Sequence, residues 1–81
     1  MTQETVNYYT DELKRFKTVS SKKAFLTRSK KDVQEYIDDL NRALNGKFTG
    51  WLNGERIYQD YIHPQEDELR LIEKLYNKLT K

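Results

Sequence analysis

Apolar residues recur at intervals of three and four near the start of the chain, which is the spacing of one helix face. That face is formed by Val6, Tyr9, Leu13 and Phe16. We therefore predict a helix over about residues 3–17, with Thr2 as its N-cap.

The next part of the chain predicts a short helical turn followed by a longer helix. The turn lies near residues 22–28. Ser29, with Asp32 three residues later, has the spacing of a capping box and predicts a new helix over about residues 30–45. The Asn-Gly pair that ends at Gly46 supplies a stop signal. The inward stripe of this helix is Val33, Tyr36, Ile37, Leu40 and Leu44.

The C-terminal part of the chain predicts a third amphipathic helix, over about residues 64–79. Pro64 fits its first position, because the fixed φ of proline suits a helix and its missing N–H would have no partner there. Acidic residues in the first turn complement the positive end of the helix dipole. The apolar stripe is Leu69, Ile72, Leu75, Tyr76 and Leu79.

Between the last two helices, Asn53-Gly54 predicts a β-hairpin over residues 47–62, because a type I′ turn needs positive φ at both of its central positions. The pairs would be Leu52–Glu55, Trp51–Arg56, Gly50–Ile57 and Thr49–Tyr58. One face, covered by the helices, would hold Phe48, Leu52, Ile57 and Tyr61. The opposite face would hold Trp51, Arg56 and Tyr58.

The alternative for this segment is a fourth helix in an all-α bundle. Gly50 and Gly54 would each cost such a helix about 0.5–1 kcal/mol, so we favour the hairpin. The fold class that follows is a mainly α, small single domain over residues 1–81, with three amphipathic helices, a short helical turn and one hairpin.

Composition agrees with a small helical domain. Charged residues make up 35% of the chain, so the core must be thin, and helices with narrow apolar stripes suit it. The absence of cysteine excludes disulfides and thiolate metal sites. No apolar run approaches the ~20 residues of a membrane-spanning helix, and the N-terminus lacks the apolar stretch of a signal peptide. We expect a cytoplasmic protein.

Charge is distributed very unevenly along the chain. Eight basic residues and no acidic residue fall between positions 14 and 31, while the net charge of the chain is +2, so the other 63 residues sum to −6. The eight are Lys14, Arg15, Lys17, Lys22, Lys23, Arg28, Lys30 and Lys31. Such a separation attracts polyanions, and we predict that these side chains contact the phosphates of a nucleic acid. The alternative is a solvated face that keeps a polar protein soluble.

The order of the predicted elements is similar to that of a winged helix-turn-helix: a helix, a short turn, a longer helix and a hairpin. The resemblance implies that the helix over 30–45 would present its first residues to base edges. This chain departs from that pattern on the same helix, where phosphates would repel Asp32, Glu35, Asp38 and Asp39.

No constellation in the sequence points to catalysis, and we expect a non-enzymatic protein. His63 is the sole histidine, and spacing pairs it with neither a nucleophile nor an orienting group. The glycines lack a phosphate-cradling pattern. Carboxylates that share a face of the helix over 30–45 are typical of a solvated surface. We predict no metal, no cofactor and no small-molecule substrate.

Two functions remain open. The first is a small regulatory protein that binds nucleic acid through residues 14–31. The second is a protein-binding inhibitor, immunity-type protein or adaptor, of the kind that phages and plasmids encode, using the aromatic segment 48–61. Its contact residues would be Trp51, Arg56 and Tyr58, since Trp, Tyr and Arg dominate interface hot spots.

Overall fold

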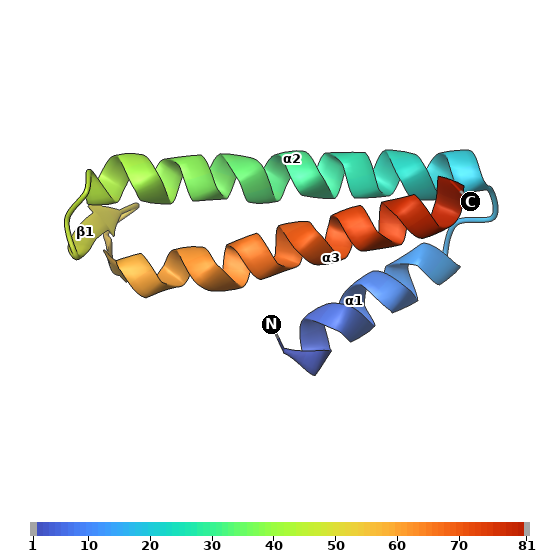
Figure 1. Cartoon of the computed structure of the whole chain (residues 1–81), viewed down its shortest axis with the longest axis horizontal. Coiled ribbons are helices and arrows are strands. Elements are labelled where there is room, and N and C mark those ends of the chain that lie inside the picture. Colours follow the sequence, from blue (N-terminus) through green and yellow to red (C-terminus); the bar gives the residue numbers. More distant parts are fainter. Residues whose placement is uncertain (1, 81) are drawn as a thin grey trace.

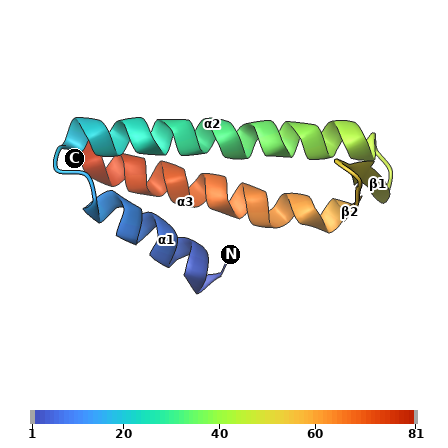
Figure 2. The same ribbon diagram turned by 180° about the vertical axis from the view of Figure 1, so that it is seen from behind.

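The computed structural model describes residues 2–80 as a helical hairpin with a shorter helix folded against it (Figures 1 and 2). In chain order the elements are α1 (Gln3–Lys14), α2 (Val19–Leu44), β1 (Thr49–Leu52), β2 (Glu55–Tyr58), the 3₁₀ turn η1 (Gln59–Tyr61) and α3 (Ile62–Thr80). The two long helices run antiparallel, the strands lie at the turn between them, and α1 lies along the half of the molecule farther from the strands (Figure 1). The predicted mainly α class with one hairpin is confirmed.

The segment expected to break near Ser29 is one continuous helix, α2, of 26 residues. Its N-terminus is capped by Thr18, whose Oγ1 accepts a hydrogen bond from the backbone N–H of Ser21 at 3.1 Å. No glycine or proline occurs within α2, so a serine followed by an aspartate does not interrupt the helix there. The prediction of a separate turn near 22–28 and a helix that begins near 30 is wrong. The predicted order of elements of a winged helix-turn-helix is therefore wrong as well, because α2 is continuous where that motif has its turn.

Apart from the start of α2, the helix ends lie within three residues of the predicted ones, although the first turn of α3 holds no acidic residue. Thr2 is the N-cap of α1, as predicted, and its Oγ1 accepts from the N–H of Thr5 at 3.3 Å. α1 ends at Lys14, earlier than expected. α3 begins at Ile62, so Pro64 lies within its first turn, where the missing N–H of proline costs no helical hydrogen bond.

The hairpin has the predicted register: Thr49 faces Tyr58, Gly50 faces Ile57, Trp51 faces Arg56 and Leu52 faces Glu55. Asn53 and Gly54 have φ values of 52° and 81°, both positive as a type I′ turn requires. The alternative of a fourth helix is therefore wrong. Asn45 and Gly46 also have positive φ, 49° and 76°, and end α2 where a stop was predicted.

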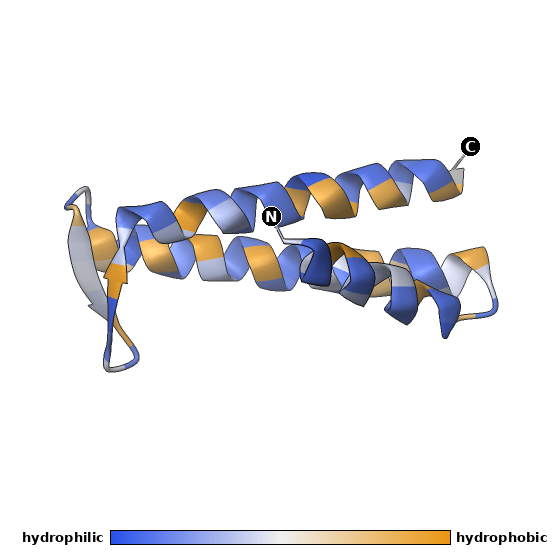
Figure 3. Cartoon of the chain, turned by 90° about the horizontal axis from the view of Figure 1, so that it is seen from below, coloured by the Kyte–Doolittle hydropathy of each residue, from blue (hydrophilic) through white to orange (hydrophobic). Residues whose placement is uncertain are grey.

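Buried side chains form two clusters along the interface of α2 and α3. The larger cluster consists of Tyr9, Leu26, Val33, Ile37 and Ile72. The second, beneath the hairpin, consists of Leu40, Leu44 and Ile57. Tyr36, predicted to point inward, is 39% exposed, because the buried stripe of this half of α2 is narrow (Val33, Ile37, Leu40 and Leu44) and Tyr36 lies beside it. In Figure 3, apolar stretches (orange) recur along both long helices between polar ones (blue).

Candidate binding surfaces

The end of the molecule farthest from the hairpin brings basic segments together. The last turn of α1, the loop after it, the first turns of α2 and the last turns of α3 meet there (Figures 1 and 2). Their basic residues, which we call the basic end, are Lys14, Arg15, Lys17, Lys22, Lys23, Lys74 and Lys78. Lys74 and Lys78 were missed from the sequence, because only the antiparallel packing of α3 on α2 places them beside residues from the start of the chain.

Three of the predicted cations already have partners within the chain. Arg15 is 3.4 Å from a carboxylate one turn earlier, and Lys30 Nζ is 3.4 Å from Glu73 Oε1. Lys23 Nζ lies over the ring of Tyr76, 5.6 Å from its centroid. Lys30 and Glu73 are 53% and 55% exposed, so water screens their attraction. These positive charges therefore stay accessible to an external polyanion.

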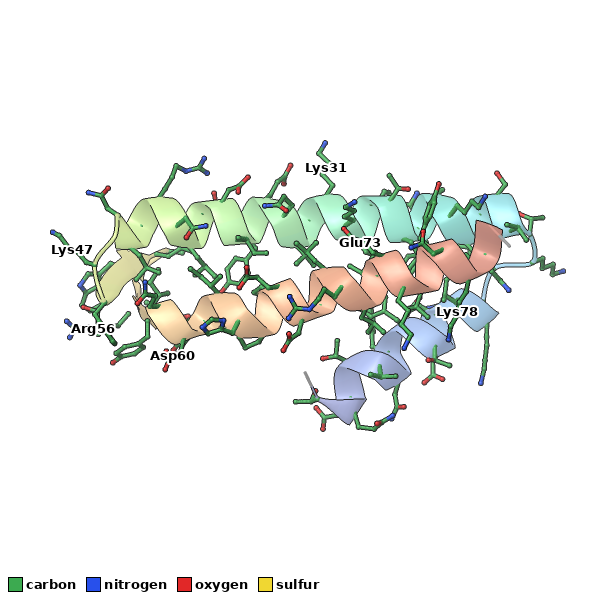
Figure 4. All side chains as sticks on the ribbon, viewed as in Figure 1. Lys31, Lys47, Arg56, Asp60, Glu73 and Lys78 are labelled. Atoms are coloured by element: carbon green, nitrogen blue, oxygen red, sulfur yellow. The ribbon has the colours of Figure 1, made fainter. Side chains whose placement is uncertain are left out.

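Two of the eight predicted residues lie on another side of α2. Lys31 points away from α3 (Figure 4), and Arg28, one turn earlier, shares its outer face. Lys30 lies on the flank that meets α3. The eight residues therefore do not form one patch: five gather at the basic end and three continue around the N-terminal half of α2.

A hydrogen bond and aromatic contacts fix α1, and with it two of the cations, at the basic end. The hydroxyl of Tyr9, a residue only 2% exposed, donates to Glu68 Oε2 on α3 at 2.5 Å. Burial, together with the bond to Glu68, holds the pKa of Tyr9 well above its usual range. The ring of Phe25 lies 6.1 Å from that of Tyr9 and 5.4 Å from that of Phe16. These rings pack α1 on α2.

Replacing Tyr9 by phenylalanine is expected to lower the free energy of unfolding by about 1–2 kcal/mol, because a hydrogen bond to a carboxylate is lost while the ring remains. Since folding raises the pKa of Tyr9, its contribution is complete below the ordinary tyrosine value of 10.0 and decreases as the pH rises above it. Urea unfolding at about pH 8 and about pH 11 should therefore show a smaller alkaline loss for Tyr9→Phe than for the wild type. Tyr8→Phe is the control, because Tyr8 is 53% exposed; equal effects of the two substitutions would contradict the role of Tyr9.

The outer face of the hairpin carries a second surface, which we call the aromatic platform: Trp51, Arg56, Tyr58 and Tyr61. Trp51 is 63% exposed, Tyr58 43% and Tyr61 41%. The guanidinium carbon of Arg56 lies 5.5 Å from the centroid of the Trp51 ring. The rings of Tyr58 and Tyr61 meet edge to face, with centroids 5.7 Å apart. The three residues predicted for protein contact thus share one exposed face.

Two residues predicted for the covered face of the hairpin are exposed instead. Phe48 is 75% exposed and Tyr61 is 41% exposed. The strand ladder begins at Thr49, so Phe48 lies outside its alternation, and η1 turns the chain before Tyr61. Ile57 is buried as predicted, at 2% exposed, and Leu52 is half-buried.

A groove of about 430 Å³ lies between α2 and α3. Leu26 and Ile72 lie at its floor, and the Lys30–Glu73 ion pair and Tyr76 line it as well. Its two charged groups, Lys30 and Glu73, form an ion pair with each other.

Two further pairs of titratable groups lie on the surface of α3. His63 Nδ1 is 3.6 Å from Glu66 Oε1, with the histidine side chain 80% exposed, and Arg70 lowers the pKa of Asp67 through a hydrogen bond. Among residues 2–80 no group of three or more His, Asp or Glu side chains is placed to hold a metal ion. Within the same residues, no helix has the length and apolar character needed to cross a membrane. The described part of the chain thus presents two candidate surfaces, the basic end and the aromatic platform, at opposite ends of the molecule.

Comparisons of this chain with protein-family models, with curated proteins and with solved structures gave no match.

Proposed function

We propose that this protein is a small, cytoplasmic, non-enzymatic regulatory protein that binds nucleic acid through its basic end. The observation that carries the proposal is the convergence of cations from three helices and a loop on one end of a molecule 43 Å long. Lysine and arginine contacts with phosphates supply the sequence-independent part of nucleic-acid affinity. Arg28 and Lys31 on the outer face of α2 would extend this basic surface.

The charge of the rest of the molecule would orient the protein as it approaches a nucleic acid. Residues 32–70, which form the hairpin half, hold nine acidic and four basic side chains. A nucleic acid would be attracted to the basic end and repelled by the hairpin half, so the protein would approach phosphates with the basic end first. The alternative, a basic surface that serves only solvation, predicts no such binding.

The double variant Lys17→Ala/Lys22→Ala tests this proposal. We expect it to weaken binding to a labelled DNA duplex roughly tenfold. The slope of log K against log salt should fall in magnitude by about 1.8, because two fewer phosphates are neutralised and about 0.9 counterion is released for each. Wild-type affinity should fall roughly 10²–10³-fold between about 50 and 200 mM salt. Fluorescence anisotropy with duplex DNA, single-stranded DNA and single-stranded RNA measures both quantities.

The matched control is Arg42→Ala/Lys47→Ala, which removes the same charge from the hairpin half of the molecule. Both side chains are exposed, so the fold should be retained. We expect binding within about twofold of the wild type, since the proposal places no phosphate contact on the hairpin half. Equal losses in the two double variants, or no wild-type binding to any of the three nucleic acids at low salt, would refute the proposal.

A further inference from the structure

The aromatic platform is a binding surface in its own right, separate from the basic end. The exposed parts of Trp51, Tyr58 and Tyr61 amount to roughly 300 Å² of aromatic surface. Single exposed apolar side chains are ordinary, but a contiguous patch of this size lies in the range of the largest patches on monomeric proteins, which are often functional. With Arg56 stacked on Trp51, the patch also has the residue types that dominate binding energy at protein interfaces.

The platform is held rigidly by the opposite face of the hairpin. Ile57 is buried against Leu40 and Leu44 of α2. Gly50 lies so close to α2 that a Cβ atom there would be 2.5 Å from the carbonyl oxygen of Ala43. Because the hairpin is seated directly on the helix, a partner would find the aromatic rings already in place, and little ordering would be needed on binding.

The charge around the platform selects the class of partner. Residues 32–70 are mainly acidic, and two of their four basic side chains, Arg42 and Arg70, are ion-paired with aspartates of their own helices. Lys47 and Asp60 both project from the same end of the molecule as Arg56 (Figure 4), and the hairpin itself is electrically balanced, so the acidic excess comes from the helix turns that flank it. Phosphates would be repelled from this end, whereas lysine and arginine side chains around an apolar pocket would be attracted to it.

We propose that the aromatic platform docks a protein partner whose surface offers an apolar pocket for Trp51, bordered by basic side chains. The proposal is independent of nucleic-acid binding, because the platform and the basic end lie at opposite ends of the 43 Å axis (Figure 1). A protein with both surfaces in use would join a basic-rimmed protein to a nucleic acid. The hairpin would then be the docking element and the helices the spacer between the two sites.

Selection of random twelve-residue peptides displayed on phage, against the immobilised full chain, tests the proposal directly. We expect enrichment of peptides that combine aromatic or large aliphatic residues with lysine or arginine. A synthetic enriched peptide should shift the emission of Trp51, the only tryptophan, to shorter wavelength as the ring leaves water. Its affinity should fall at least thirtyfold in Trp51→Ala, as for a hot-spot residue, and stay within about twofold in Tyr36→Ala, an exposed tyrosine of α2 outside the platform.

Several results would overturn this assignment. One is a selection that enriches the same peptides on Trp51→Ala as on the wild type, or that enriches none. Another is enrichment of acidic peptides, which would contradict the charge argument. Single-stranded DNA binding that is lost in Trp51→Ala but kept in Lys17→Ala/Lys22→Ala would make the platform a base-stacking surface instead. Conversely, peptide binding that Lys17→Ala/Lys22→Ala leaves unchanged would support two independent sites, whatever the basic end binds.

Discussion

Replacing Leu40 by alanine is expected to lower the free energy of unfolding by about 3–5 kcal/mol, one of the two largest effects among the substitutions considered. Leu40 is 0% exposed and packs with Leu44 and Ile57, so it joins α2 to the hairpin. Truncation removes apolar contacts and leaves a cavity that the surrounding backbone cannot fully close. A domain of 81 residues has a total stability of only about 4–12 kcal/mol. The variant should therefore lie close to its unfolding limit at physiological temperature.

Thermal and urea unfolding, followed by circular dichroism, measure this loss; the melting temperature should fall by about 4–8 °C for each kcal/mol. Val19→Ala is the control, because Val19 lies on the same helix but is 50% exposed, and its effect should stay within about 0.5 kcal/mol. Trp51 fluorescence reports the hairpin independently of the helices. Coincident transitions by both probes would show that the hairpin and the helices unfold together. A decrease in the free energy of unfolding below about 1 kcal/mol in Leu40→Ala would contradict close packing between α2 and the hairpin.

The hairpin could be predicted in detail because its signals are local. A type I′ turn restricts φ at two adjacent positions, and Asn53-Gly54 meets that restriction at low steric cost. Once the turn is placed, the two-residue alternation of strands determines every pair and both faces. The prediction failed only at Phe48 and Tyr61, which lie just outside the ladder, where alternation no longer applies.

The false break near Ser29 shows the opposite case. A serine followed three residues later by an acidic residue resembles a helix start, but the same spacing occurs by chance inside helices. The choice between the two depends on whether the chain is interrupted, and α2 contains no glycine or proline. Leu26 is fully buried within the stretch predicted to be a separate turn, so packing against α3 favours one continuous helix over two.

The basic end could be predicted only in part, because it depends on tertiary structure. Its N-terminal members are neighbours in the sequence, so their grouping was visible as a run of charge. In the sequence, Lys74 and Lys78 are explained by the negative end of the dipole at a helix C-terminus. Only the structure shows that the end of α3 lies beside the start of α2 (Figures 1 and 2). The same return brings Glu73 within 3.4 Å of Lys30, so a carboxylate lies beside one of the predicted cations, although both side chains remain exposed.

Both candidate surfaces thus depend on how the ends of α2 are held. At one end Tyr9 and Phe25 hold α1, and at the other the hairpin sits on Ala43 and Leu44. The core between them is thin, so each surface should respond to substitutions in its own supporting contacts more than to distant ones. A substitution at the contact between the hairpin and α2 can therefore change the position of the aromatic platform without changing any residue of the platform.

Gly50→Ala is expected to destabilise the protein by about 3 kcal/mol, at the upper end of overpacking effects, although it adds only one methyl group. Its Cβ would lie 2.5 Å from the carbonyl oxygen of Ala43 and 3.3 Å from the Cα of Leu44. These atoms belong to the backbone of α2, so no side-chain rotation can relieve the contact. The hairpin must move away from the helix, which would uncover Ile57 and displace Trp51 and Arg56 without altering either residue.

The matched control is Gly54→Ala, the same chemical change in the same hairpin. Gly54 has a φ of 81° and nothing within 4 Å of an added Cβ, so only backbone strain of about 1–2 kcal/mol is expected there. Gly50→Ala should therefore be the more harmful of the two, even though Gly54 has the conformation that alanine avoids. Urea unfolding gives the order of stabilities, and titration with a platform-binding peptide should show a larger loss of affinity for Gly50→Ala. The reverse order of stabilities would mean that the hairpin is free to move relative to α2, and that the platform is not a rigid surface.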